Sequence, residues 1–150
     1  MGRLSHINDE GRAQMVDVSA KPLQQRAAKA RGEIRMAKEP LKLICGNKIA
    51  KGNVLATARI AGIQAAKSTG DLIPMCHPLP INQCEVGFEL PKSGDRIVIT
   101  ALAKVTAQTG VEMEALTAVN LAALTIYDMC KAVDKKMRIT NVKLISKTKV

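Results

Sequence analysis

The spacing of apolar residues along the chain predicts a mixture of strands and helices. Residues 15–19 alternate apolar and polar side chains, a pattern typical of a short strand. Four more strands are expected, within residues 21–37, at residues 83–90, at residues 96–107 and at residues 138–145. Residues 91–95, Pro-Lys-Ser-Gly-Asp, are turn formers, so they predict a hairpin between the two strands that flank them.

Boundary residues predict two shorter helices. Pro40 in a first turn, followed by apolar residues, predicts a helix that ends near Gly46. Asn53 is a suitable N-cap for a second helix, which Gly70 is expected to stop. Residues 46–52 begin and end with glycine and predict a mobile loop between the two helices.

Residues 115–133 are almost all apolar, which predicts a long buried helix. Thr109 and Glu112 have the spacing of a capping box at its start. Asp128 and Lys131 are polar exceptions on one face, since three residues turn a helix through about 300°. Burying a charge is costly unless it is paired or used, so these two residues form a structural ion pair or line a reactive cleft.

Glu114 extends this polar stripe through Thr117 and Asn120 towards Asp128 and Lys131. A stripe of this kind faces solvent or a pocket. Its mixture of carboxylate, amide and ammonium groups favours the pocket, although Glu112 nearby is also explained by capping alone.

Pro74, Pro78 and Pro80 predict an extended, irregular segment that holds Cys76 and His77. Adjacent cysteine and histidine are poorly spaced for tetrahedral zinc, so no metal site is predicted. Histidine transfers protons near neutral pH, and a buried, hydrogen-bonded histidine is the alternative interpretation.

The order of elements predicts an α+β fold, a two-layer sandwich with helices packed on one face of a mostly antiparallel sheet. Residues 1–150 are expected to form one catalytic domain. Apolar residues make up 47% of the chain, but only Phe88 and Tyr127 are aromatic. The core must therefore consist of leucine, isoleucine, valine, methionine and alanine, and so thin a core favours self-association.

The formal net charge of +10 favours anionic partners, among them nucleic acid, anionic lipid and phosphorylated small molecules. The lack of aromatic stacking platforms weakens the case for single-stranded nucleic acid. No glycine-rich phosphate loop is present, so separate lysines and arginines would bind a phosphate. Lys51 and Lys67 are candidates, although a solvated loop charge and a helix-dipole contact explain them equally.

Four cysteines without a paired spacing indicate reduced thiols. The first residues lack the apolar core of a signal peptide, and no apolar stretch is long enough to span a bilayer. We therefore expect a cytoplasmic protein with no membrane partner.

Four segments together closely resemble the cyclic pyranopterin monophosphate synthase family of molybdenum cofactor biosynthesis. They are residues 15–19 (MVDVS), residues 58–67 (ARIAGIQAAK), residues 71–79 (DLIPMCHPL) and residues 109–133 (TGVEMEALTAVNLAALTIYDMCKAV). The resemblance covers nearly the whole chain and keeps the order and spacing of the segments.

The resemblance implies a ferredoxin-like fold and a lyase-type enzyme. Its substrate would be 3′,8-cyclo-7,8-dihydroguanosine triphosphate, and its products cyclic pyranopterin monophosphate and pyrophosphate. It also implies a homohexamer built as a trimer of dimers, with sites at subunit interfaces. No cofactor is implied, although Mg²⁺ can accompany the triphosphate.

The resemblance also assigns site residues. The family's catalytic aspartate falls on Asp128 and its companion lysine on Lys131. Further active-site positions fall on Lys51, His77 and Glu112. Positions that contact substrate fall on Met75, Cys76, His77, Met113, Glu114, Lys67 and Arg26.

Two other functions remain open from the residues alone. A non-catalytic basic module would bind nucleotides or RNA with a steep salt dependence. A purely structural oligomer would use Asp128 and Lys131 only to fix the register of helices. The resemblance favours the enzyme, which would bind a single small nucleotide and no nucleic acid.

Overall fold

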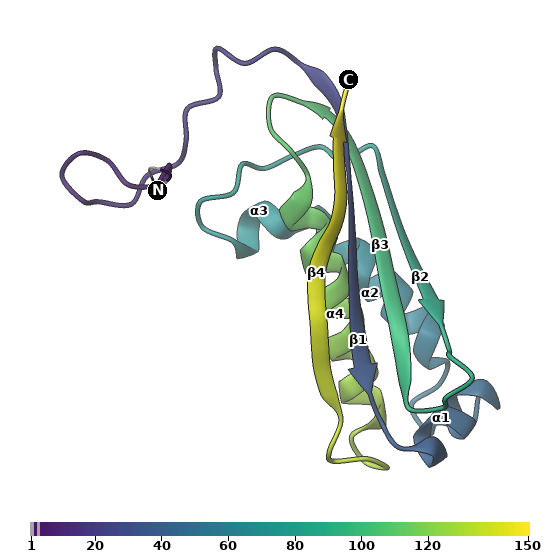
Figure 1. Ribbon diagram of the computed structural model, residues 1–150. Helices are drawn as coiled ribbons and strands as arrows, with labels where there is room; N and C mark the ends of the chain where they lie inside the picture. Colours follow the sequence, from purple (N-terminus) through teal and green to yellow (C-terminus); the bar gives the residue numbers. More distant parts are fainter. Residues whose placement is uncertain (1, 3) are drawn as a thin grey trace.

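The computed structural model describes residue 2 and residues 4–150, and its strands form one antiparallel sheet with helices on a single face (Figure 1). Along the chain the elements are β1 (Gln24–Arg35), α1 (Lys38–Cys45), α2 (Val54–Lys67), α3 (Thr69–Leu72), β2 (Gln83–Glu89), β3 (Arg96–Ala107), α4 (Glu112–Cys130) and β4 (Arg138–Lys149). The strand order is β2-β3-β1-β4. Apart from α1 and α3, this is the β-α-β-β-α-β arrangement of ferredoxin-like folds, so the predicted fold class is confirmed.

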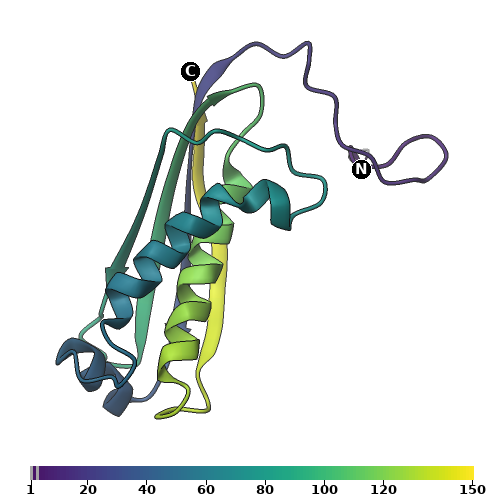
Figure 2. The ribbon, with the colours of Figure 1, turned by 180° about the vertical axis from the view of Figure 1, so that it is seen from behind.

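The two longer helices, α2 and α4, lie side by side over the sheet (Figure 2). The β2–β3 hairpin and α1 form where their turn residues and Pro40 predicted them. The side chain of Asn53 caps α2 by accepting a hydrogen bond of 2.9 Å from the amide of Ala56. None of the described helices is long and apolar enough to cross a membrane.

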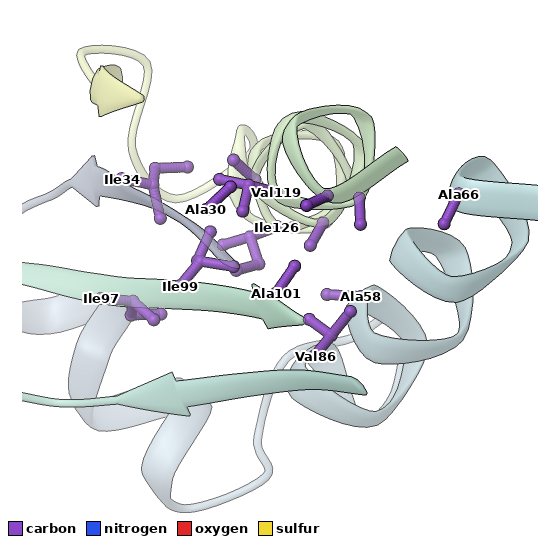
Figure 3. Packing of buried hydrophobic residues seen from close by; sticks show 14 of the residues in the cluster. Ala30, Ile34, Ala58, Ala66, Val86, Ile97, Ile99, Ala101, Val119 and Ile126 are labelled. Carbon is purple, nitrogen blue, oxygen red and sulfur yellow. The ribbon is translucent and has the colours of Figure 1, made fainter. Parts of the chain in front are cut away.

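Small and branched aliphatic residues fill the space between α4 and the sheet (Figure 3). Ile34, Ile99 and Ile126 are fully buried there. Glycine permits the closest contacts: a Cβ on Gly32 would lie 2.6 Å from a methyl group of Val119, and one on Gly62 would lie 2.9 Å from the carbonyl oxygen of Ala118. The expected aliphatic core is confirmed.

Residues 15–19 do not form the expected strand. They belong to residues 4–23, here called the N-terminal arm, which extends away from the sheet (Figure 1). The alternation has another cause, because Val16 and Val18 face a cavity at the start of α4 while Asp17 is exposed to solvent.

Two residues do not play the roles at helix ends that were predicted for them. α4 begins at Glu112 after Val111, and no side chain caps it. The expected capping box of Thr109 and Glu112 does not form; instead the carboxylate of Glu112 lies 3.3 Å from the ammonium of Lys147. Gly70 does not stop α2, which ends at Lys67; it lies inside α3. A Cβ on Gly70 would lie 2.9 Å from the Cα of Pro78, so glycine permits close packing there.

A buried carboxylate on the uncovered face of the sheet was not predicted. Glu33 on β1 has a side chain that is 6% exposed, and its oxygens lie 3.3 Å from Arg31, 3.4 Å from Arg96 and 3.6 Å from Arg35. Asn141 donates a further hydrogen bond of 3.2 Å. Burial raises the pKa of Glu33, but the bond from Asn141 and the three arginines outweigh it, so the pKa lies below its ordinary value.

Replacing Glu33 with Gln is expected to lower the free energy of unfolding by about 1–3 kcal/mol at neutral pH. Because the folded pKa is lowered, the carboxylate contributes stability above its unfolded pKa, and that contribution is lost as pH falls through the folded pKa. Denaturant unfolding at fixed chain concentration should therefore show the gap to wild type closing in acid. Glu89→Gln, at an exposed position on the same sheet face, is the control. Equal losses in the two variants at every pH would contradict this role for Glu33.

Candidate active site

The candidate site residues lie in two groups at opposite ends of α4. Lys51, Asp128 and Lys131 gather at its C-terminal end, here called the lysine–aspartate group. At its N-terminal end, a cavity of about 310 Å³ is lined by Met75, Cys76, His77, Glu112, Met113 and Glu114; this is the histidine cavity. Glu114 and Asp128 are 14 residues apart in the sequence, about 21 Å along the helix axis.

The carboxylate of Asp128 is held between two ammonium groups. Lys131, the C-cap residue of α4, donates to Oδ1 at 2.8 Å, because residues three apart share a helix face. Lys51 reaches Oδ2 at 3.2 Å and the carbonyl oxygen of Asp128 at 3.1 Å from the loop at residues 46–52. The predicted loop is present, and it delivers a lysine to the end of α4.

The apolar sequence of the helix suggested that Asp128 and Lys131 are buried, but in the single chain they are not. Both side chains are 57% exposed, because they lie at the end of α4 on its solvent side. Hydrogen bonds from Lys131 and then Lys51, with their charges, lower the pKa of Asp128 below its ordinary value. The hydrogen bond to Asp128 raises the pKa of Lys131. Both residues are therefore charged at neutral pH.

The histidine cavity provides groups of a different kind. Glu114 is 3% exposed, and burial, with a smaller contribution from Glu112, raises its pKa. Burial likewise raises the pKa of the Cys76 thiol, with Glu114 adding to the effect. Nε2 of His77 lies 2.7 Å from the carbonyl oxygen of Val16 in the N-terminal arm. This end of α4 therefore combines an imidazole with a carboxyl group that binds a proton more readily than usual.

Arg26 and Lys67 flank the histidine cavity without lining it. Arg26, on β1, donates to the carbonyl oxygens of Ala107 and Gln108, both at 3.3 Å, and borders a neighbouring cavity of about 220 Å³ that shares Glu112. Lys67, in the last turn of α2, is exposed and lines a second hollow. Leu79 lines both this hollow and the histidine cavity. Arg26 and Lys67 therefore each line a hollow that shares a residue with the histidine cavity.

Sequence reasoning missed two lysines at this end. Lys21, on the N-terminal arm, lines the histidine cavity, and Lys147, on β4, lies 3.3 Å from Glu112. Lys147 pairs with Ala28 of β1, whose side chain faces the helices, so Lys147 faces them too. No local pattern in the sequence indicates this register. Among the described residues, no group of histidine, cysteine, aspartate and glutamate side chains is arranged to hold a metal ion, and the four cysteines are free thiols.

The chain has a ferredoxin-like α+β fold with ionisable groups at both ends of one helix and several cations around them. The MoaC family matches residues 15–149, and this chain belongs to that family.

Three curated relatives illustrate the similarity. The cyclic pyranopterin monophosphate synthase of Desulfitobacterium hafniense is 57% identical over 145 residues, which are 97% of this chain and 88% of that protein. Cyclic pyranopterin monophosphate synthase 3 of Mycobacterium tuberculosis is 54% identical over 147 residues, 98% of this chain and 82% of that protein. The synthase of Thermoanaerobacter pseudethanolicus is 54% identical over 145 residues, 97% of this chain and 92% of that protein. The chain is therefore similar to these synthases over nearly its full length.

Proposed function

We propose that this protein is a cyclic pyranopterin monophosphate synthase of molybdenum cofactor biosynthesis. It converts 3′,8-cyclo-7,8-dihydroguanosine triphosphate to cyclic pyranopterin monophosphate and releases pyrophosphate. The observation that carries the proposal is the similarity to synthases of that name over 97–98% of the chain. The cations and acid–base groups at the ends of α4 suit a reaction that handles a triphosphate and several protons.

The active site in this proposal is assembled from two copies of the chain. A single chain keeps the lysine–aspartate group about 21 Å from the histidine cavity. Residue 121 lies midway between Glu114 and Asp128, so two α4 helices that cross antiparallel there would bring unlike ends together. The exposed side of α4 that joins its ends carries few charges: Met113 is 38% exposed, Leu124 is 53% exposed, and Asn120 lies between them. Such a face suits packing against a second helix.

The full assembly is proposed to be a homohexamer, a trimer of such dimers, as the family resemblance implies. The thin aliphatic core supports further burial between chains, as does Ile60 of α2, which is 68% exposed. Light scattering on the purified protein distinguishes a hexamer from a dimer.

Positive side chains hold the triphosphate in this proposal. Lys51 and Lys131 approach from the lysine–aspartate group, and Arg26 and Lys67 flank the histidine cavity. Attack on the α-phosphorus expels pyrophosphate, and such transfers depend mostly on positioning and charge neutralisation. The reaction is proposed to need no cofactor held by the protein; any Mg²⁺ would arrive on phosphate oxygens, which are ligands that it prefers.

Ring opening and reclosure need groups that give and take protons. Asp128 is proposed as a base and Lys131 as its acid partner, and the two titrate as one coupled pair. His77, Glu112 and Glu114 serve the same chemistry from the other end, while Met75, Cys76 and Met113 shape the pocket. The free thiols fit a reducing compartment, so we propose that the enzyme is cytoplasmic.

The direct test supplies the purified chain with the cyclised guanosine triphosphate and follows pyrophosphate and pterin. We expect one pyrophosphate per pterin formed and no turnover of GTP itself. Absence of both products with folded protein would overturn the proposed function.

The uncovered face of the sheet favours one alternative, a basic module that binds RNA. Its strands carry Lys29, Arg31, Lys104 and Lys143 on that face. However, this face has no aromatic side chain among the described residues, and single strands bind by stacking bases on such rings. A thermal-shift series with GTP, ATP and a short RNA separates the two functions: stabilisation that grows with RNA length would favour the module.

A further inference from the structure

We propose that His77 reacts only through Nδ1, because the carbonyl group of Val16 in the N-terminal arm holds a proton permanently on Nε2. The arm is then a positioning element of the active site that selects one nitrogen of the imidazole. This inference rests on the proposed function for the reaction in which His77 takes part, but the contact between His77 and Val16 does not depend on any substrate.

The first argument is the chemistry of the contact. A backbone carbonyl oxygen only accepts hydrogen bonds, so the distance of 2.7 Å requires that Nε2 of His77 carries a proton and donates it to Val16. In a neutral imidazole only one nitrogen carries a proton. Nδ1 is therefore the unprotonated nitrogen and the position at which His77 accepts a proton.

The second argument is that the arm holds the Val16 carbonyl in place. The side-chain amide of Gln108, just after β3, donates to the carbonyl oxygens of Ser19 at 3.3 Å and Lys21 at 3.1 Å. Asp17 accepts from the amide of Ser19 at 2.9 Å and from its hydroxyl group, which closes a turn directly after Val16. The hydrogen bonds from Ser19 lower the pKa of Asp17, and nearby His77 contributes to the same effect. The acceptor is thus anchored to the sheet by two contacts beyond His77 itself.

The third argument is the setting of the ring. His77 lies between Cys76 and Pro78, and proline fixes the backbone direction at that point. The ring lines the histidine cavity, where Lys21 and His6 approach from the arm.

The carboxylates of Glu112 and Glu114 approach the same cavity from α4. In a turnover, Nδ1 takes one proton from the bound nucleotide, which leaves an imidazolium ion and a substrate carrying one more negative charge. The same nitrogen later returns that proton, while the proton on Nε2 stays with Val16 throughout.

The test uses nitrogen NMR on the full chain. The sequence has two histidines, so His6→Gln leaves a single imidazole to observe. We expect a proton bonded to Nε2 that exchanges slowly with water, together with an unprotonated Nδ1 in the neutral ring. A neutral ring protonated on Nδ1, or an Nε2 proton in fast exchange with water, would overturn the inference.

Two substitutions separate the roles of the nitrogens. His77→Gln places an amide near Nε2, so it should keep the arm bound, hold KM within about 3-fold and lower kcat by about 10²-fold or more. His77→Asn cannot reach Val16, so KM should rise as well and amide exchange in residues 14–18 should accelerate. Equal arm exchange in the two variants would contradict the anchoring role. Exchange and NMR need no turnover, so an inactive wild type with the expected spectra would refute only the proposed function.

Discussion

Asp128→Asn is expected to fold normally and to lower turnover of the cyclised nucleotide by about 10²–10⁴-fold, the usual contribution of a positioned acid or base. The amide keeps the shape of the side chain but takes no proton. The lowered pKa of Asp128 keeps the wild-type carboxylate ionised, which is the form that can accept a proton. Lys131→Ala should lose a comparable factor, because it removes the ammonium group 2.8 Å from that carboxylate. Steady-state pyrophosphate release and thermal unfolding are the measurements.

A matched control lies on α1. Glu39 and Lys42 are also three residues apart on a helix, and their charged atoms are 3.8 Å apart, with side chains that are 81% and 74% exposed. Glu39→Gln and Lys42→Ala should leave turnover within about 2-fold of wild type, since exposed pairs contribute little. If Asp128→Asn or Lys131→Ala behaves like these controls, the acid–base assignment is wrong and the pair has a structural role.

The fold could be predicted largely from local signals. Asn53 marks the start of α2, residues 91–95 form the hairpin turn, and the apolar run at residues 115–133 forms most of α4. These predictions succeeded because each depends on a few neighbouring residues. The alternation in residues 15–19 led to a wrong prediction of a strand. An extended arm with one side against a cavity shows the same alternation of apolar and polar residues as a strand with one side against a core.

The position of the site residues depends on tertiary structure. Asp128 and Lys131 were expected to be buried because their helix is apolar, but they lie at its exposed end. The lysine of the loop after α1 reaches Asp128 across 77 positions, and no spacing in the sequence indicates that contact. The burial of Glu33 could not be predicted for the same reason, because its partners Arg96 and Asn141 lie on β3 and β4.

The central claim is that one catalytic site joins the two ends of α4 from two copies of the chain. The most direct test co-expresses two inactive variants with different tags. One is Asp128→Asn, and the other combines His77→Ala with Glu112→Gln. Random pairing makes half of all dimers mixed, and each mixed dimer contains one site free of substitutions and one that carries all of them.

Mixed preparations, and hexamers purified through both tags, should therefore recover about a quarter of wild-type turnover per chain, because about half of their dimers are mixed and each mixed dimer has one intact site of two. Each variant alone should remain below about 1% of wild type, as expected when a positioned acid–base group is lost. Turnover of hexamers purified through both tags that stays at the level of the two parent variants would contradict the account, because it would mean that every chain needs both ends of its own α4.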